Sequence, residues 1–225
     1  MKNLILTLNI LIISTLILGG NPSYPTSRQD TSILNQLYYN GRVWYGQYFN
    51  VYGTEFLIED AWYKADITIN GIPFNDVKIK YDIYNDELLA NYYDKRIIIL
   101  NNENIEKFTI YINDHELHFK NFHERGNMAG YYQLIYEGQS KLYKKWRKKR
   151  AQFVIEARYD EFQDDDAIII VLEDRPYEIR KRRNLLKILS DKKSEIRSFI
   201  RQEDIRLDFD KPESLIPVLK YYDNL

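Results

Sequence analysis

Alternation of apolar and polar residues dominates the chain from about residue 41 to residue 170. Apolar side chains occupy every second position in segments 63–69, 77–83 and 108–112. This period of two is typical of strands that bury one face. Polar turns of a few residues separate these segments, so successive strands are expected to pair antiparallel.

The dipeptide Asn70-Gly71 lies between the first two of these segments. It is a strong hairpin signal, because both central residues of a type I′ turn need positive φ. A two-residue turn places apolar residues opposite each other beside the turn, but the same register would place Val77 opposite Lys64. We therefore predict a bulge at Asn75-Asp76, where one extra residue restores the apolar phase.

The period changes to a helical one near the end of the chain. Segment 183–204 has apolar residues at helical spacing, with Ser190-Asp191 as an expected N-cap between two helical pieces. A last helix is predicted over about 215–222, capped by Ser214. The predicted fold is α+β: mainly an antiparallel β-meander sheet with two or three C-terminal helices, which pack on one face or the end of the sheet.

The first twenty residues have the pattern of an export signal, with Lys2 before an apolar stretch over 4–18. An uncleaved N-terminal anchor is the alternative, although the stretch is short for a membrane span. The predicted organisation is an export signal over 1–20, a flexible lead over 21–40, a β domain over 41–180 and a helical tail over 181–225. The expected location is the periplasm, the outer-membrane surface or the extracellular space.

The charge balance and the cysteine count exclude several kinds of partner and site. Lys plus Arg is 32 and Asp plus Glu is 33, so no global positive field attracts nucleic acid, which we do not expect as a partner. The absence of cysteine excludes disulfides, cysteine nucleophiles and thiolate metal sites. No further apolar run matches the first, so we expect no transmembrane span after signal removal.

Three segments together resemble a group of uncharacterised exported bacterial proteins. They are VKIKYDIYNDELL (77–89), GYYQLIYEGQSKLYKKW (130–146) and the ending NLLKILSDKKSEIRSFIRQEDIRLDFDKPESLIPVLKYYDNL (184–225). That group combines a β-meander with a short helical tail. The resemblance implies export and this order of elements. It implies no functional residue, because the group has no assigned activity.

The acidic segment 70–89 raises the question of a carboxylate site. Asp82 falls on the polar side of an alternating strand, Asp76 at the predicted bulge, and Asp86 and Glu87 in a turn, so we expect a solvent-facing role. His115, His118 and His123 lack zinc-motif spacing, and residues 164–166 lack the spacing of a calcium loop. We expect no metal and no cofactor.

The segment KLYKKWRKKR over 141–150 combines cations with aromatic side chains and is the candidate site for an anionic or glycan ligand. The alternative is a solvated hairpin edge, where lysine blocks unwanted strand pairing. A second basic run over 180–183 precedes the helices, and we assign no binding site to it. The candidate residues are Lys141, Tyr143, Lys144, Lys145, Trp146, Arg147 and Lys148.

Aromatic residues are dense over 44–52, where they could form core or a binding face. No nucleophile or phosphate-loop motif is present, although a hydrolase with dispersed residues is a further reading. The sequence predicts a non-catalytic envelope structural or interaction protein with an unidentified protein or envelope partner. The alternative is a binding module for an anionic or glycan ligand at 141–150.

Overall fold

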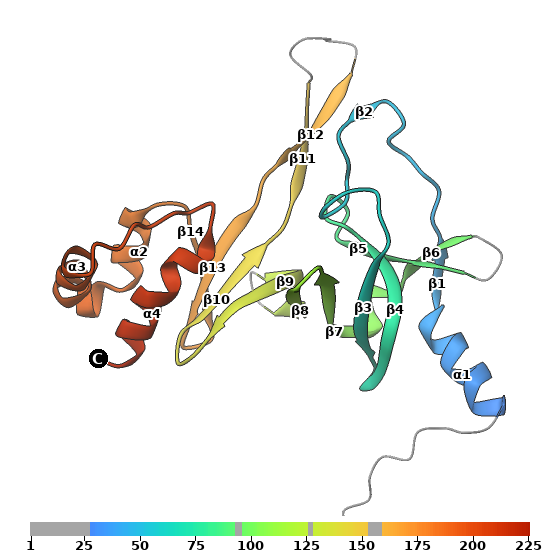
Figure 1. The fold of residues 1–225 in the computed structure, drawn as a ribbon, viewed down its shortest axis with the longest axis horizontal. Coiled ribbons are helices and arrows are strands. Elements are labelled where there is room, and N and C mark those ends of the chain that lie inside the picture. Colours follow the sequence, from blue (N-terminus) through green and yellow to red (C-terminus); the bar gives the residue numbers. More distant parts are fainter. Residues whose placement is uncertain (1–27, 93–95, 126–127, 153–158) are drawn as a thin grey trace, which may run out of the picture.

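The computed structural model describes residues 28–92, 96–125, 128–152 and 159–225. It confirms an α+β fold that is mainly antiparallel sheet, with three of the four described α-helices at the C-terminal end (Figure 1). The predicted export signal over 1–20 lies outside the described residues. No helix among those residues is long and apolar enough to span a membrane.

Most strands of the described chain belong to one sheet of eleven strands, in the order β1-β6-β5-β4-β3-β7-β8-β9-β10-β13-β14. This order consists of two meanders that meet where β3 pairs with both β4 and β7. The bounds are β1 Gly41–Val43, β3 Tyr63–Ile69, β4 Ile72–Asp82, β5 Glu87–Asn91, β6 Ile97–Leu100, β7 Ile105–Ile112, β8 His115–Arg125, β9 Met128–Glu137, β10 Lys141–Lys145, β13 Ala167–Leu172 and β14 Arg175–Ile179. A 3-10 turn, η1 Asn102–Asn104, precedes β7.

The β3–β4 hairpin has the predicted turn and bulge. Asn70 and Gly71 have φ values of 48° and 76°. Ile67 pairs with Phe74 and Ala65 with Val77, so two residues of β4 lie opposite Asp66 alone. The backbone N–H of Asp76 donates to Asp66 Oδ1 at 2.9 Å. The bulge at Asn75-Asp76 is therefore confirmed, and it keeps the apolar side chains on the core face.

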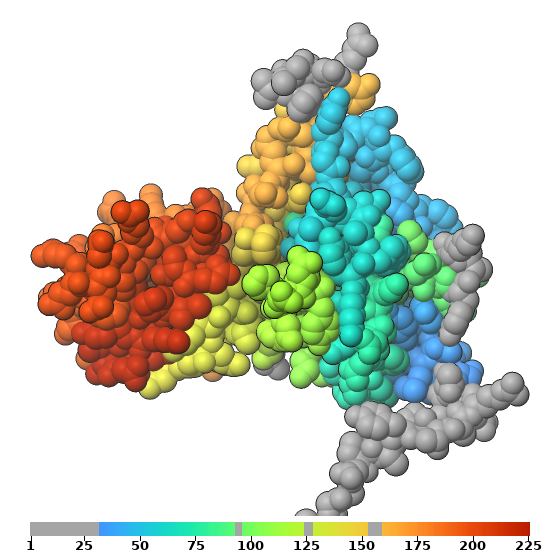
Figure 2. Space-filling view, in the orientation of Figure 1, coloured from blue at the N-terminus to red at the C-terminus, as the bar shows by residue number. Residues whose placement is uncertain are grey.

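One long hairpin continues beyond the large sheet. Strands β10 and β13 pair within it, and the same two chain segments pair again as β11 (Lys148–Gln152) and β12 (Asp160–Asp164). β12 also pairs in parallel with β2 (Val51–Tyr52) to make a sheet of three strands. Together with segment 44–50, these three strands form what we call the arm, which projects from the body of the molecule in Figures 1 and 2.

The lead predicted to be flexible over 21–40 contains helix α1, Arg28–Tyr38. The Tyr38 side chain is buried, and its ring centroid lies 5.3 Å from that of Phe74. Burial of an aromatic ring supplies the free energy that orders this helix. Residues 28–38 of the predicted lead are therefore helical in this structure.

Three helices form a lobe at one end of the sheet (Figures 1 and 2). They are α2 Arg182–Ile188, α3 Lys193–Gln202 and α4 Ile216–Asp223, with 3-10 turns η2 Ser190–Lys192 and η3 Pro212–Leu215 before α3 and α4. The helical pieces are as predicted, but the caps are not. Lys192 precedes α3 without a side-chain cap, and the Ser214 hydroxyl donates to the carbonyl oxygen of Asp208 at 2.9 Å.

Of the four apolar clusters among the described residues, the two largest hold these parts together. The first lies inside the curved sheet, where Tyr81 makes T-shaped contacts with Phe108, Phe119 and Tyr131. The second joins β10, β13 and β14 to the helices, and it is centred on buried residues such as Leu142. The helical tail is therefore attached by the same kind of apolar burial that stabilises the sheet.

Candidate functional site: the arm and the polar cluster at its base

Asp82 is completely buried, so its predicted place on a solvent face is wrong. Segment 54–60 pairs with the end of β4, where the Leu57 N–H donates to the Tyr81 carbonyl and Phe56 forms an antiparallel bridge with Asp82. The Asp82 carboxylate accepts from the backbone N–H groups of Tyr84 and Asn85 and from the Asn85 side chain. Burial raises the pKa of Asp82 to about 6, and these hydrogen bonds oppose the rise.

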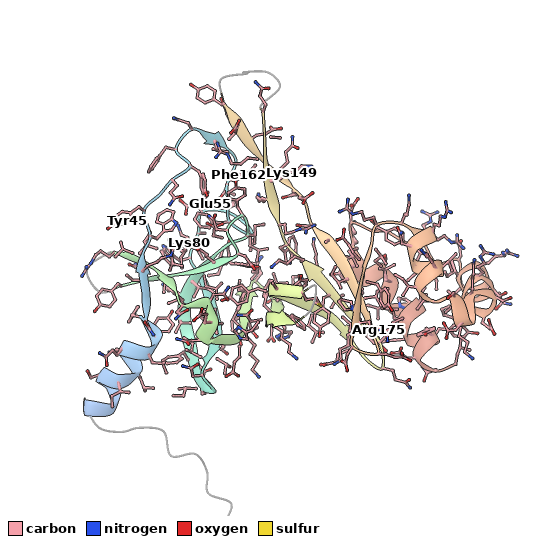
Figure 3. All side chains as sticks on the ribbon, turned by 180° about the vertical axis from the view of Figure 1, so that it is seen from behind. Tyr45, Glu55, Lys80, Lys149, Phe162 and Arg175 are labelled. Carbon is pink, nitrogen blue, oxygen red and sulfur yellow. The ribbon has the colours of Figure 1, made fainter. Side chains whose placement is uncertain are left out.

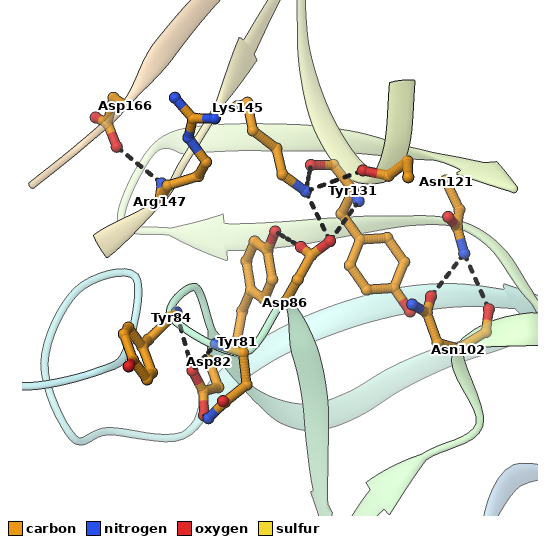
Figure 4. Close-up of polar contacts among 12 residues, drawn as sticks. Tyr81, Asp82, Tyr84, Asp86, Asn102, Asn121, Tyr131, Lys145, Arg147 and Asp166 are labelled. Atoms are coloured by element: carbon orange, nitrogen blue, oxygen red, sulfur yellow. Dashed lines mark hydrogen bonds and ion pairs between the residues drawn. The ribbon is translucent and has the colours of Figure 1, made fainter. Parts of the chain in front are cut away.

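Asp86, in the turn after β4, lies at the centre of a second polar group. Its Oδ2 accepts from Lys145 Nζ at 2.6 Å and from the Tyr131 N–H at 3.2 Å, and its Oδ1 accepts from the Tyr81 hydroxyl at 2.6 Å (Figure 4). We call Tyr81, Asp86, Tyr131 and Lys145 the base cluster. It ties the β4–β5 turn to β9 and β10 at the base of the arm.

Lys145 is almost buried, and its amine also donates to the Tyr131 carbonyl at 3.0 Å. Burial lowers the pKa of the Lys145 amine, while the Asp86 carboxylate raises it. The site requires glycine at position 130, which has a φ of 81°. A Cβ atom there would overlap Asp86 Oδ2 and lie 2.9 Å from Lys145 Nζ.

Lys144 points to the opposite face of β10, as alternate residues of a strand do. Its amine lies 2.8 Å from Asp166 Oδ2 and 3.3 Å from the centre of the Trp146 ring. The Trp146 Nε1–H donates to Gln133 Oε1 at 2.7 Å. This arrangement holds the point where β10 leaves the large sheet and β11 begins.

The structure divides the predicted ligand-binding residues between the two faces of the hairpin. Tyr143 is buried, Lys144 and Lys145 are nearly so, and Trp146 is half-buried. Every cation of segment 141–150 has a carboxylate partner. The pairs are Lys141–Glu137, Lys144–Asp166, Lys145–Asp86, Arg147–Asp165, Lys148–Asp164, Lys149–Asp165 and Arg150–Asp160. Ligand binding by this segment stays a prediction.

An open groove of about 730 Å³ reaches the base cluster from the side of β1 and η1. Arg42, Asp86, Asn102 and Gly130 are among the residues that line it. Asp86 belongs to both the groove lining and the base cluster, and its carboxylate is the group of that cluster that could act as an acid or a base toward a ligand in the groove. Its oxygens already accept three hydrogen bonds, which makes it an anchor for the surrounding backbone and side chains.

The arm exposes aromatic side chains of segment 44–52. The sequence alone did not decide whether these side chains belong to the core or to a binding face. Tyr45 is 73% exposed and Phe49 is 86% exposed, and Tyr52 lies beside Tyr159 with ring centroids 5.8 Å apart. Figure 3 shows Tyr45 pointing away from the ribbon of this segment. Exposed aromatic rings on a fixed backbone are typical of interaction surfaces.

A second set of aromatic rings holds this segment in place. Tyr48, Tyr84 and Phe162 contact one another with ring centroids 5.1–5.4 Å apart. The Arg150 guanidinium lies 5.9 Å from the Tyr48 ring centre. The exposed rings therefore extend from an ordered scaffold formed by the β4–β5 turn and β12.

No group of three or more histidine, cysteine or acidic residues within the described part of the chain is placed to hold a metal ion. His118 Nε2 lies 3.4 Å from Glu116, and its Nδ1 lies 3.0 Å from the Thr109 hydroxyl. The acidic residues 164–166 contact Lys144, Arg147 and Lys148 instead.

Comparisons of this chain with protein-family models, with curated proteins and with solved structures find no match. The functional argument therefore depends on the residues and their geometry. Sequence reasoning identified the aromatic segment 44–52 but missed the base cluster, because Asp86 and Lys145 are 59 positions apart.

Proposed function

We propose that this chain is a non-catalytic interaction protein of the cell envelope, which contacts a protein partner through the exposed aromatic side chains of the arm. The observation that carries the proposal is the exposure of Tyr45 and Phe49 on a segment whose backbone is fixed by a separate aromatic cluster. Rigid aromatic side chains lose little conformational entropy on binding, which favours them in protein interfaces.

The hydrogen bonding of the two carboxylates nearest the base of the arm supports a non-catalytic role. Asp82 and Asp86 accept hydrogen bonds from turn and strand groups around them. A catalytic carboxylate needs an oxygen directed at a substrate. In this chain the raised pKa of Asp82 arises from burial in a packed turn. Perturbed pKa values also occur in structural networks of this kind.

Export to the periplasm, the outer-membrane surface or the extracellular space is part of the proposal, and the apolar segment near the start of the sequence supports it. Cell fractionation of the full chain in its own host tests this part. Recovery of the protein in the cytosolic fraction would contradict it.

Site-specific photo-crosslinking in intact host cells tests the partner. A benzophenone amino acid replaces Phe49 or Tyr45 in the arm. The control places it at Tyr177 on β14, an aromatic side chain outside the arm that is likewise exposed, at 37%. We expect both arm positions to form an adduct of the same mass with one protein, and position 177 not to form it. No adduct from the arm, or the same adducts from all three positions, would overturn the proposal.

A further inference from the structure

The helical lobe contains a groove of about 750 Å³ between α2 and α3 with a strongly basic lining. Three cationic side chains come from each helix, and all six are exposed. Leu186 lies at the groove with its side chain buried. We call this site the α2–α3 groove. Its cations are Arg182, Arg183, Lys187, Lys193, Arg197 and Arg201.

Helical spacing explains why these charges share one groove. Lys193, Arg197 and Arg201 follow each other at intervals of four residues, which places them in one stripe along α3. On α2, Arg183 and Lys187 have the same spacing. The acidic residue of α3, Glu195, is two positions from Lys193 and from Arg197, so it lies on the opposite side of the helix.

None of the six cations forms an ion pair with another described residue, in contrast to the cations of segment 141–150. Arg180, the neighbouring basic residue, pairs with Glu178 at 2.7 Å. Without the six groove residues the chain has 26 basic and 33 acidic residues, a net charge of −7. The groove is therefore a local concentration of positive charge on an otherwise acidic protein.

This concentration is unfavourable in the absence of an anion. Like charges repel across the groove. Two of the arginines also lie in the first turn of α2, where no acidic residue is present and the helix dipole disfavours positive charge. Four of the six cations are arginines, whose planar guanidinium groups bind phosphate with two parallel hydrogen bonds. A ligand with several phosphate groups would satisfy the whole lining.

We propose that the α2–α3 groove binds a ligand with several phosphate groups. The ligand is either a soluble oligophosphate or the headgroups of an anionic phospholipid surface. The groove lies on the helical lobe and uses no residue of the arm, so this inference does not depend on the proposed protein partner.

The test uses the purified full chain and two probes at constant ionic strength. Sodium tripolyphosphate is titrated calorimetrically, and vesicles of phosphatidylcholine with or without phosphatidylglycerol are assayed by flotation. The test variant is Arg197→Gln with Arg201→Gln. The matched control is Lys78→Gln with Lys107→Gln, which removes the same charge from exposed positions of β4 and β7.

We expect the wild-type chain to bind at least one probe and the groove variant to bind it on the order of tenfold more weakly or worse, as expected for two lost charge-assisted hydrogen bonds. The control should bind as the wild type does. Binding of tripolyphosphate alone assigns a soluble ligand, and binding of phosphatidylglycerol vesicles alone assigns lipid headgroups. No binding to either probe, or equal weakening in both variants, would overturn the proposal. Circular dichroism checks that both variants are folded.

Discussion

Tyr81 and Tyr131 offer a matched pair of hydroxyl deletions within one core. Both side chains are buried, and their ring centroids lie 5.7 Å apart in a T-shaped contact. The Tyr81 hydroxyl donates to Asp86 Oδ1 at 2.6 Å, whereas the Tyr131 hydroxyl has no hydrogen-bond partner among the described residues. Replacing either tyrosine by phenylalanine removes one oxygen atom and leaves the ring in place, so each change isolates the contribution of one hydroxyl.

The two changes should have opposite effects on the free energy of unfolding. Loss of a hydrogen bond to a charged acceptor costs about 1.5–3 kcal/mol, so Tyr81→Phe should be destabilised by about this amount. An unpaired buried hydroxyl carries a desolvation penalty of about 1–3 kcal/mol, so Tyr131→Phe should be unchanged or stabilised. The smallest expected difference is about 1.5 kcal/mol, or about 3–6 °C in Tm for a chain of this size.

Guanidinium unfolding followed by tryptophan fluorescence measures both variants against the wild type, since the chain has three tryptophans. Equal m-values would show that the variants expose the same surface on unfolding. A Tyr131→Phe variant that is destabilised as much as Tyr81→Phe would refute the reasoning. That result would mean that the hydroxyl of Tyr131 has a partner, or that hydrogen bonding does not distinguish the two positions.

Three further predictions concern Asp82 and the base cluster. Burial raises the pKa of Asp82 from 3.8 to about 6, so the folded state binds this proton more tightly than the unfolded state does. The contribution of Asp82 to wild-type stability should therefore fall by about 3 kcal/mol as pH rises from about 3 to about 7, and unfolding titrations of Asp82→Asn should lack this component of the slope. Lys145→Met should lose about 1–3 kcal/mol because the partly exposed Asp86 carboxylate loses its cation, and adding Asp86→Asn should recover part of that loss in a double-mutant cycle. Gly130→Ala should lower Tm in a calorimetric scan, because its Cβ would overlap Asp86 and its φ is positive; an unchanged Tm would contradict this account of the base cluster.

Much of the fold could be predicted because it depends on local patterns. The period of two along β3 and β4, with Asn70-Gly71 between them, was sufficient to predict the hairpin and its bulge. The change to helical spacing after residue 183 indicated the helical lobe. The helix caps were predicted less well, because Ser214 bonds to Asp208 within the preceding turn. A serine side chain can hydrogen-bond nearby backbone groups in a helix cap or in a turn, and its position in the sequence does not show which of these forms.

The candidate sites depended on contacts between distant segments. Alternation placed Asp82 toward solvent, but Phe56 from a distant segment pairs with it, and both side chains are buried. The basic run over 141–150 had the composition of an anion site, but the hairpin brings residues 160–166 directly opposite it, so that carboxylates neutralise its cations.

The sequence by itself determined the class of fold, the strand hairpins and the helical ending, because side-chain periodicity and turn residues act over a few positions. Only the tertiary structure decided which charges are paired and which aromatic rings are exposed. Segment 141–150 and the cations of α2 and α3 are both strongly basic in sequence. Packing places carboxylates beside the first and leaves the second without an ion-pair partner among the described residues. The energy of a charge depends on its neighbours in space, which strand pairing and helix packing determine.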